Sequence, residues 1–237
     1  MKGSTRSGPH PVIAWARAGA SWLLTLLTPV ALLGLALRLL LTPVFLQAEY
    51  RMPYFPPDQY GFTLQDRLRW GPYGLNFVVN DAGVSYLADL KFDDGSPLFN
   101  SRELSHMQDV QRLTHSGLRL WYVALALLLG LGVWARAGNW LPAYLEGLWR
   151  GGWLMVGLAA ALGLLVGVGM TTDPDLFWGF FTAFHGMFFS GDTWLFEYSD
   201  TLIRLYPIRF WQDAFLAAAL IVLGSGLGLA LSFKPKH

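Results

Sequence analysis

The chain alternates long apolar stretches with shorter polar regions. Four stretches, at 18–45, 118–134, 148–170 and 215–233, approach or exceed the roughly 20 residues of helix that a bilayer crossing requires. Trp, Tyr, Pro or charged residues border each of them, as is typical of lipid–water boundaries. The first stretch is too long for a signal peptide and lacks a small-residue cleavage site, so we expect it to remain as an anchor. The pattern predicts an all-α membrane protein with four transmembrane helices.

The polar region 46–117 is too long to be a simple connection. Residues 66–79 mix apolar and polar positions as an amphipathic helix does, and 83–87 predicts a short helix or strand. Residues 93–97 combine Asp, Gly, Ser and Pro and predict a turn. Ser101 is the predicted N-cap of a helix that continues into the second span. We expect this region to fold into a cap.

The second long polar region, 171–214, contains a mainly apolar and aromatic segment at 176–189. That segment is too short and too interrupted to cross a bilayer. It predicts a re-entrant or interfacial helix, lying against the membrane surface.

Basic residues of the short segments predict the orientation, because cytoplasmic segments are enriched in Lys and Arg. The tail 1–17 has no acidic residue, whereas the region from Thr171 to Arg209 holds five acids and two Arg. We therefore expect both tails (1–17 and 234–237) and the loop 135–147 in the cytoplasm, with the cap outside. The basic residues that support this assignment are Lys2, Arg6, Arg17, Arg136, Arg150, Lys234 and Lys236.

Composition strengthens the membrane assignment and excludes several kinds of chemistry. Hydrophobic residues make up 54% of the chain and charged residues 14%, against about 25% charged in soluble domains. The net charge of +1 gives no reason to expect a nucleic-acid partner. Because the chain has no Cys, disulfides, thiolate zinc sites, iron–sulfur clusters and a Cys nucleophile are excluded.

Three of the five His fall at the predicted outer membrane surface, where ionisable groups are often functional. On a helix, Glu103, His106 and Asp109 follow one another at three-residue steps and share one half of the surface. A carboxylate beside an imidazole can raise its basicity, as a general base requires. The alternative is a solvated helix face whose charges pair locally.

His185 stands in an aromatic run, where a buried imidazole needs a hydrogen-bond partner in either a structural or a catalytic role. His115 lies one turn before the second span, and contact with lipid headgroups explains it. His10 and His237 belong to polar tails and should be exposed to solvent.

A metal site is not expected. Glu103 and His106 match half of a di-iron carboxylate motif, but Thr182 stands where the second Glu would precede His185. Arg38, near the outer end of the first span, either extends to the headgroups or binds a substrate phosphate or carbonyl. Close helix packing accounts for the glycines of the spans, such as Gly163, Gly167, Gly169, Gly224, Gly226 and Gly228.

Several stretches together resemble the Lit family, the bacterial lipoprotein intramolecular transacylases. They are LF at 98–99, RELSHMQDV at 102–110, and FHGMFF at 184–189 with Trp194 after it. The region 200–207, EY at 49–50 and YL at 86–87 fit as well. The resemblance extends from about residue 20 to residue 230, with four spans in the same order.

This resemblance implies a bacterial cytoplasmic-membrane enzyme with four helices and an extracellular cap, formed mainly by the first outside loop. Such an enzyme moves the sn-2 acyl chain of a diacylated lipoprotein onto the amine of its N-terminal Cys, giving a lyso-form lipoprotein. His106 and His185 would perform the catalysis. The implied partners are the lipoprotein substrate and membrane lipids, with no cofactor and no obligate protein partner.

The residues are compatible with that reaction. The α-amine of the substrate's N-terminal Cys has a pKa near 8, so a base must deprotonate it before it can attack. One imidazole can act as this base, and the other can protonate the departing sn-2 oxygen. We predict His106 as the base because Glu103 and Asp109 are near it in sequence. Arg102 either binds a carbonyl or the departing oxygen, or forms a salt bridge to an acid of the loops. An aromatic wall would exclude water, and its predicted members are Tyr50, Phe184, Phe188 and Trp194.

Two other functions fit the same pattern. A non-catalytic membrane protein that binds lipid or a partner would keep the aromatic outer surface but would have no need of two His. A membrane lipid hydrolase would use the same His pair with water as the nucleophile.

Overall fold

The computed structural model describes residues 11–172, 175–189, 191 and 193–235. The predictions for His10, His237, Lys2, Arg6 and Lys236 lie outside these ranges. Within them every regular element is a helix, apart from a single bridge between Lys91 and Pro97.

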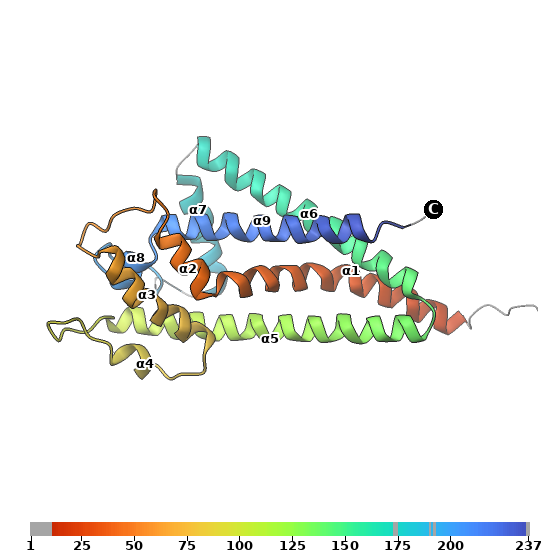
Figure 1. Ribbon diagram of the computed structural model, residues 1–237, viewed down its shortest axis with the longest axis horizontal. Coiled ribbons are helices and arrows are strands. Elements are labelled where there is room, and N and C mark those ends of the chain that lie inside the picture. The colour runs from red at the N-terminus through yellow and green to blue at the C-terminus, as the bar shows by residue number, and fades with distance from the viewer. Residues whose placement is uncertain (1–10, 173–174, 190, 192, 236–237) are drawn as a thin grey trace, which may run out of the picture.

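Four long helices form the bundle: α1 (Pro11–Leu40), α5 (Ser101–Ala137), α6 (Leu141–Thr172) and α9 (Ile208–Ser232). All four are long and apolar enough to cross a membrane, which confirms the predicted number. Helices α1, α5 and α9 run alongside one another, and α6 crosses them obliquely (Figure 1). The first and last helices both reach the end of the bundle opposite the cap, as an even number of crossings requires.

The helix ends differ from the predicted spans. Helix α1 ends at Leu40, and a separate helix α2 (Pro43–Tyr50) begins with Thr42 as its N-cap, although 18–45 had been predicted as one span. Proline disfavours helical backbone in the residue before it, which accounts for the break. Arg38 therefore lies in the last turn of α1, and its side chain donates to the carbonyl of Leu41 at 3.3 Å.

The N-cap of α5 is Asn100, so the prediction of Ser101 was wrong by one residue. The Asn100 side chain accepts from the backbone N–H of Glu103 at 3.0 Å, and the Glu103 carboxylate accepts from the N–H of Asn100 at 2.7 Å. This reciprocal pair is a capping box. Both Ser and Asn are good caps; here Asn100 follows the buried Phe99 and also donates to Asp200 at 2.9 Å.

Close packing in the bundle depends on some of the glycines of the predicted spans. A Cβ at Gly151 would lie 2.5 Å from the Cβ of Thr28 on α1, and one at Gly152 would lie 2.8 Å from the carbonyl of Gly226 on α9. All three of these glycines lie in predicted spans, and Gly226 is also one of the six that were named as examples. Among the described residues, no atom lies within 4 Å of a Cβ built at Gly163, Gly167, Gly224 or Gly228. The surroundings of Gly169 are outside the described part of the structure.

The first loop and part of the second fold over one end of the bundle (Figure 1). Helix α3 (Leu64–Val79) confirms the amphipathic helix, and 83–87 contributes to the short helix α4 (Ser85–Ala88) rather than to a strand. The turn at 93–97 is confirmed, with Gly95 at a φ of 85°. Helix α8 (Thr201–Leu205) comes from the second loop. The shared core consists of Trp70, Phe77, Val78, Leu87, Leu98, Phe99, Met107, Leu202 and Leu205.

Helix α7 (Asp175–Phe188) follows α6 and runs across the bundle axis beside the cap (Figure 1). This confirms a helix in the aromatic segment that was predicted to be too short for a fifth span. Its direction brings its C-terminal turn toward the start of α5.

Candidate functional site

The two candidate imidazoles come from different elements and meet beside the cap. His106 lies in the second turn of α5, and His185 lies in the last turn of α7. Their ring centroids are 6.4 Å apart and their planes are nearly parallel, at 23°. The two residues are only 9% and 8% exposed. The fold therefore brings together the two His that the sequence singled out.

Aromatic rings surround this pair. Phe189 lies 5.0 Å from the ring of His106 and 5.6 Å from that of His185, so it contacts both. Phe196 packs edge-on against His106 at 5.3 Å, and Trp194 lies 4.7 Å from His185. Such an apolar environment holds little water, which strengthens electrostatic interactions inside it.

A backbone hydrogen bond fixes the tautomer of His185. Its Nδ1 lies 2.8 Å from the carbonyl oxygen of Phe181, one turn earlier in α7. Because a carbonyl only accepts, the proton is on Nδ1, and the lone pair of the neutral ring is on Nε2. Burial lowers the pKa of His185 below its ordinary value of 6.5, while the bond to Phe181 acts in the opposite direction. At neutral pH the ring is therefore in its basic, uncharged form.

His106 is held by packing rather than by a hydrogen bond to Nδ1. That atom is buried, and it has no hydrogen-bond partner among the described residues. Leaving such a group unsatisfied costs about 1–3 kcal/mol. Unsatisfied buried polar groups are rare in folded proteins and need an explanation, for which a catalytic role is one option.

Glu103 does not support His106 in the predicted way. Its residue is 1% exposed, and its carboxylate accepts from the backbone N–H of Asn100 and, at 2.7 Å, from that of Leu202. The carboxylate thus caps the N-terminus of α5 and links α8 to it through a hydrogen bond. The three-residue spacing predicted a contact with the imidazole, whereas the N–H of Leu202 that occupies the carboxylate comes from a distant segment.

Asp109 and Arg102 both form ion pairs. The Asp109 carboxylate accepts from Arg112 at 2.8 Å on the surface of α5, which is the local pairing considered as the alternative. Arg102 donates to Asp200 at 2.8 Å, so the salt bridge to a loop acid is present. Its guanidinium also lies 5.6 Å from the ring of Phe196, which in turn contacts His106.

The predicted aromatic wall is divided between two places. Phe184 and Trp194 contact His185 directly, and Phe188 packs on Phe184 at 5.1 Å. Tyr50 lies elsewhere, in a cluster with Leu46, Leu75 and Phe210, where its hydroxyl donates to the carbonyl of Leu205 at 3.0 Å. Its contacts join α2 to the cap, so the structure separates it from the imidazoles.

Sequence reasoning missed Phe181, Phe189 and Phe196 as neighbours of the His pair. Phe181 and Phe189 stand four residues before and after His185, a spacing that places them on one helix face, and this could have identified them. No comparable pattern could have identified Phe196, because it contacts His106 only through the tertiary fold.

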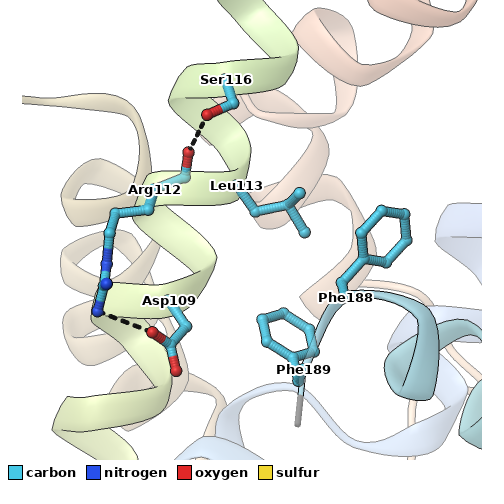
Figure 2. Close-up of a pocket in the computed structure, with 6 residues that line it drawn as sticks. All are labelled: Asp109, Arg112, Leu113, Ser116, Phe188 and Phe189. Carbon is cyan, nitrogen blue, oxygen red and sulfur yellow. Dashed lines mark hydrogen bonds and ion pairs between the residues drawn. The ribbon is translucent and has the colours of Figure 1, made fainter.

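An open pocket of about 320 Å³ lies beside the imidazoles, between α5 and the end of α7. Figure 2 shows Leu113 directed toward Phe188 and Phe189, while the side chain of Arg112 extends away from these rings and turns back to Asp109. Ser116 completes the lining. One wall of the pocket is therefore polar and the other aromatic. No group of three His, Asp or Glu suited to a metal ion occurs in the described part of the chain.

Comparison with known proteins places this arrangement in one family. Residues 23–211 match the family model described as lipoprotein intramolecular transacylase Lit. An uncharacterized protein of Aquifex aeolicus (strain VF5) is 31% identical over 201 residues, which are 85% of this chain and 87% of that protein.

Two solved structures share the fold, both of the membrane integral lipoprotein intramolecular transacylase Lit from Bacillus cereus. One superposes with a TM-score of 0.70 over 93% of this chain and 95% of its own. The other, which carries a His-to-Arg mutation, gives 0.68 over 94% and 92%. Both are 16% identical to this chain, so they establish the fold alone. The match of the family model over most of the chain shows that this protein belongs to the Lit family and is a membrane-embedded acyltransferase, a lipoprotein intramolecular transacylase.

Proposed function

We propose that the enzyme moves the sn-2 acyl chain of a diacylglyceryl lipoprotein to the amine of its N-terminal Cys by general acid–base catalysis at His106 and His185. The observation that supports this is the meeting of two buried imidazoles from α5 and α7 in an aromatic site at the cap end of the bundle. A site for lipid binding alone would have no need of two imidazoles that face each other.

The geometry favours His185 as the base, which reverses the assignment made from sequence. Its Nδ1 proton is held by the carbonyl of Phe181, so Nε2 is available to take a proton. His106 was predicted as the base because Glu103 and Asp109 are near it in sequence, but Glu103 is committed to backbone N–H groups. Asp109 does raise the pKa of His106, but burial and the neighbouring His185 outweigh it and lower that pKa to about 4. His106 is then the group that stabilises and protonates the departing oxygen.

The proton balance of this reaction is simple. The amine attacks the ester carbonyl, the new C–N bond forms, and the bond between the carbonyl carbon and the sn-2 oxygen breaks. Both rings are neutral at the start, because burial and the neighbouring His185 lower the pKa of His106 to about 4 and burial lowers that of His185. His185 takes the proton that leaves the nitrogen, and His106 receives this proton on one ring nitrogen as it gives the proton of the other to the sn-2 oxygen, so both rings finish neutral. If the amine begins as an ammonium, one further proton goes to solvent. No covalent enzyme intermediate is needed.

Positioning supplies much of the rate, because nucleophile and ester belong to the same molecule. Correct alignment of such groups is worth up to about 7–11 kcal/mol. The rings of Phe189, Trp194 and Phe196 around the imidazoles would keep out water, which otherwise competes with the amine.

We further propose that the enzyme lies in the bacterial cytoplasmic membrane with both termini inside and the cap and the imidazoles on the outer face. Arg136 lies in the last turn of α5, Lys234 follows the end of α9, and Arg150 lies in the third turn of α6. The end of α5, the start of α6 and the end of α9 lie away from the cap (Figure 1), which fits the enrichment of basic residues on the cytoplasmic side. The lipoprotein substrate and the surrounding lipids are the partners, and the reaction needs no obligate protein partner.

Intramolecular transfer can be tested with purified enzyme in lipid vesicles and two synthetic diacylglyceryl lipopeptides of different peptide sequence. Only one carries an isotopically labelled sn-2 chain. We expect mass spectrometry to find the labelled acyl group on the amine of that same peptide, with a lyso-glyceryl group. Free labelled fatty acid would identify a hydrolase, and label on the second peptide would contradict intramolecular transfer.

The charge state of His185 gives a second prediction. Because burial lowers its pKa, the ring should take up a proton only as the pH falls below the ordinary value of 6.5. We expect the NMR signals of isotopically labelled His185, identified by their loss in His185→Gln, to show a neutral ring protonated on Nδ1 from about pH 7 to about pH 8. A titration midpoint at 6.5 or above, or a proton on Nε2 of the neutral ring, would contradict this account of the base.

A further inference from the structure

The pocket between α5 and α7 combines a charged wall with an apolar one at the edge of the candidate site. Asp109, Arg112 and Ser116 supply the first wall, and Phe188 with Leu113 supplies much of the second (Figure 2). Phe188 is 48% exposed, so the apolar wall can be reached from outside. A ligand that fits must carry a polar or charged head next to hydrocarbon.

This pocket adjoins the two imidazoles. Phe189 lines it and also contacts the rings of both His106 and His185. Asp109 follows His106 by three residues on the same helix, so its carboxylate lies one turn away on a neighbouring part of the surface. A group bound at Asp109 is therefore held within one helical turn of the His pair.

The ion pair that occupies Asp109 is one that a ligand can replace. The side chains of Arg112 and Asp109 are 75% and 35% exposed, and exposed pairs of this kind contribute about 0–1 kcal/mol. Arg112 also donates to the carbonyl of Gln108 at 3.3 Å, so it keeps a partner when Asp109 is released. Replacing Arg112 by another cation at Asp109 costs little.

The substrate of the proposed reaction has a head of matching charge. Its α-amine has a pKa near 8, so at neutral pH most of it is an ammonium group, attached beside two acyl chains. A carboxylate accepts a strong, charge-assisted hydrogen bond from such a group.

We propose that Asp109 receives the α-ammonium of the substrate's N-terminal Cys in exchange for Arg112, with an acyl chain against Leu113 and Phe188. This inference rests on the proposed function and adds to it the group that recognises the amine. Asp109 then binds the nucleophile before it is deprotonated, while His185 and His106 carry out the proton transfers.

The test separates binding from chemistry by using a lipopeptide whose sn-2 chain is joined through an ether and cannot be transferred. Two forms are compared on enzyme in lipid nanodiscs, one with the free α-amine and one with a hydroxyl in its place. We expect the wild type to bind the amine form roughly tenfold to a hundredfold more tightly, the value of a hydrogen bond to a charged group. Asp109→Asn should bind both forms equally, and Asp109→Glu should keep much of the preference.

Asp93→Asn is the matched control, because Asp93 also forms an exposed ion pair, with Arg69, but in the cap; this variant should keep the full preference. If Asp109→Asn does not fold, the wild type still decides, since its preference must disappear above about pH 8 as the amine loses its charge. A preference that survives in Asp109→Asn, or that is absent in the wild type, overturns the inference. Conversion of the ester lipopeptide by the wild type is scored separately, so failure of the proposed function is distinguished from failure of this site.

Discussion

Replacing His185 or His106 is expected to lower the rate of N-acyl lipoprotein formation by roughly 10²–10⁴-fold, the usual contribution of a general acid or base. The variants to compare with the wild type are His185→Ala and His106→Phe. Because Nδ1 of His106 makes no hydrogen bond to any described residue and its ring packs among aromatic side chains, Phe should fill its place without loss of stability. The measurement is mass spectrometry of lipopeptides formed by purified wild-type and variant enzymes.

His115→Ala is the control for these two variants. His115 lies on the same helix as His106, but it faces Asp81 at 3.7 Å rather than the second imidazole, so the variant should remain active. If the two imidazoles act as a unit, the double variant should be about as slow as the slower single one. Product formation at the wild-type rate by a folded His106→Phe or His185→Ala variant would exclude the two-His mechanism.

Glu103→Ala is expected to lower the free energy of unfolding much more than the loss of an exposed carboxylate such as that of Asp93. The change removes the acceptor for the buried N–H group of Leu202, at a cost of about 1–3 kcal/mol, and the capping contact to the N–H of the exposed Asn100, worth about 0.5–2 kcal/mol. For a protein of this size we expect Tm to fall by roughly 5–20 °C, as measured by thermal unfolding in detergent or nanodiscs.

Asp93→Ala is the matched comparison for Glu103→Ala. Its carboxylate is 84% exposed in an ion pair with Arg69, and its removal should cost about 1 kcal/mol or less. Activity measured well below the Tm of each variant completes the test. A Glu103→Ala protein of normal Tm that forms no product would show that Glu103 acts on His106 or on the substrate, as the sequence alone suggested.

The contrast between Glu103 and His185 shows what a local sequence pattern can indicate and what it cannot. His185 could be identified because an imidazole in an aromatic run is unusual by composition alone, and because its stretch resembles a family motif. The role of Glu103 could not be identified in the same way. Its three-residue spacing from His106 is real, but the partner that occupies its carboxylate comes from Leu202, far along the chain.

Tyr50 and the pocket illustrate the same limit. The motif that contains Tyr50 matches the family, yet its hydroxyl binds Leu205 and its ring packs with Phe210, away from the imidazoles. The pocket unites residues of α5 with the end of α7, and no local pattern relates those two segments.

By itself the sequence determined the four membrane helices, their order and the cap region, because apolar length and helical spacing are local properties; the pairing of His106 and His185 as candidates came from the resemblance to the Lit family. The tertiary structure decided what the local pattern leaves open: the break before Pro43, the cap at Asn100, the glycines at the helix contacts and the partner of each charged group. It also placed the proton of the neutral His185 ring on Nδ1 and its lone pair on Nε2. Hydrogen bonds and ring contacts depend on distances of a few ångströms between distant segments, and only the folded chain sets those distances.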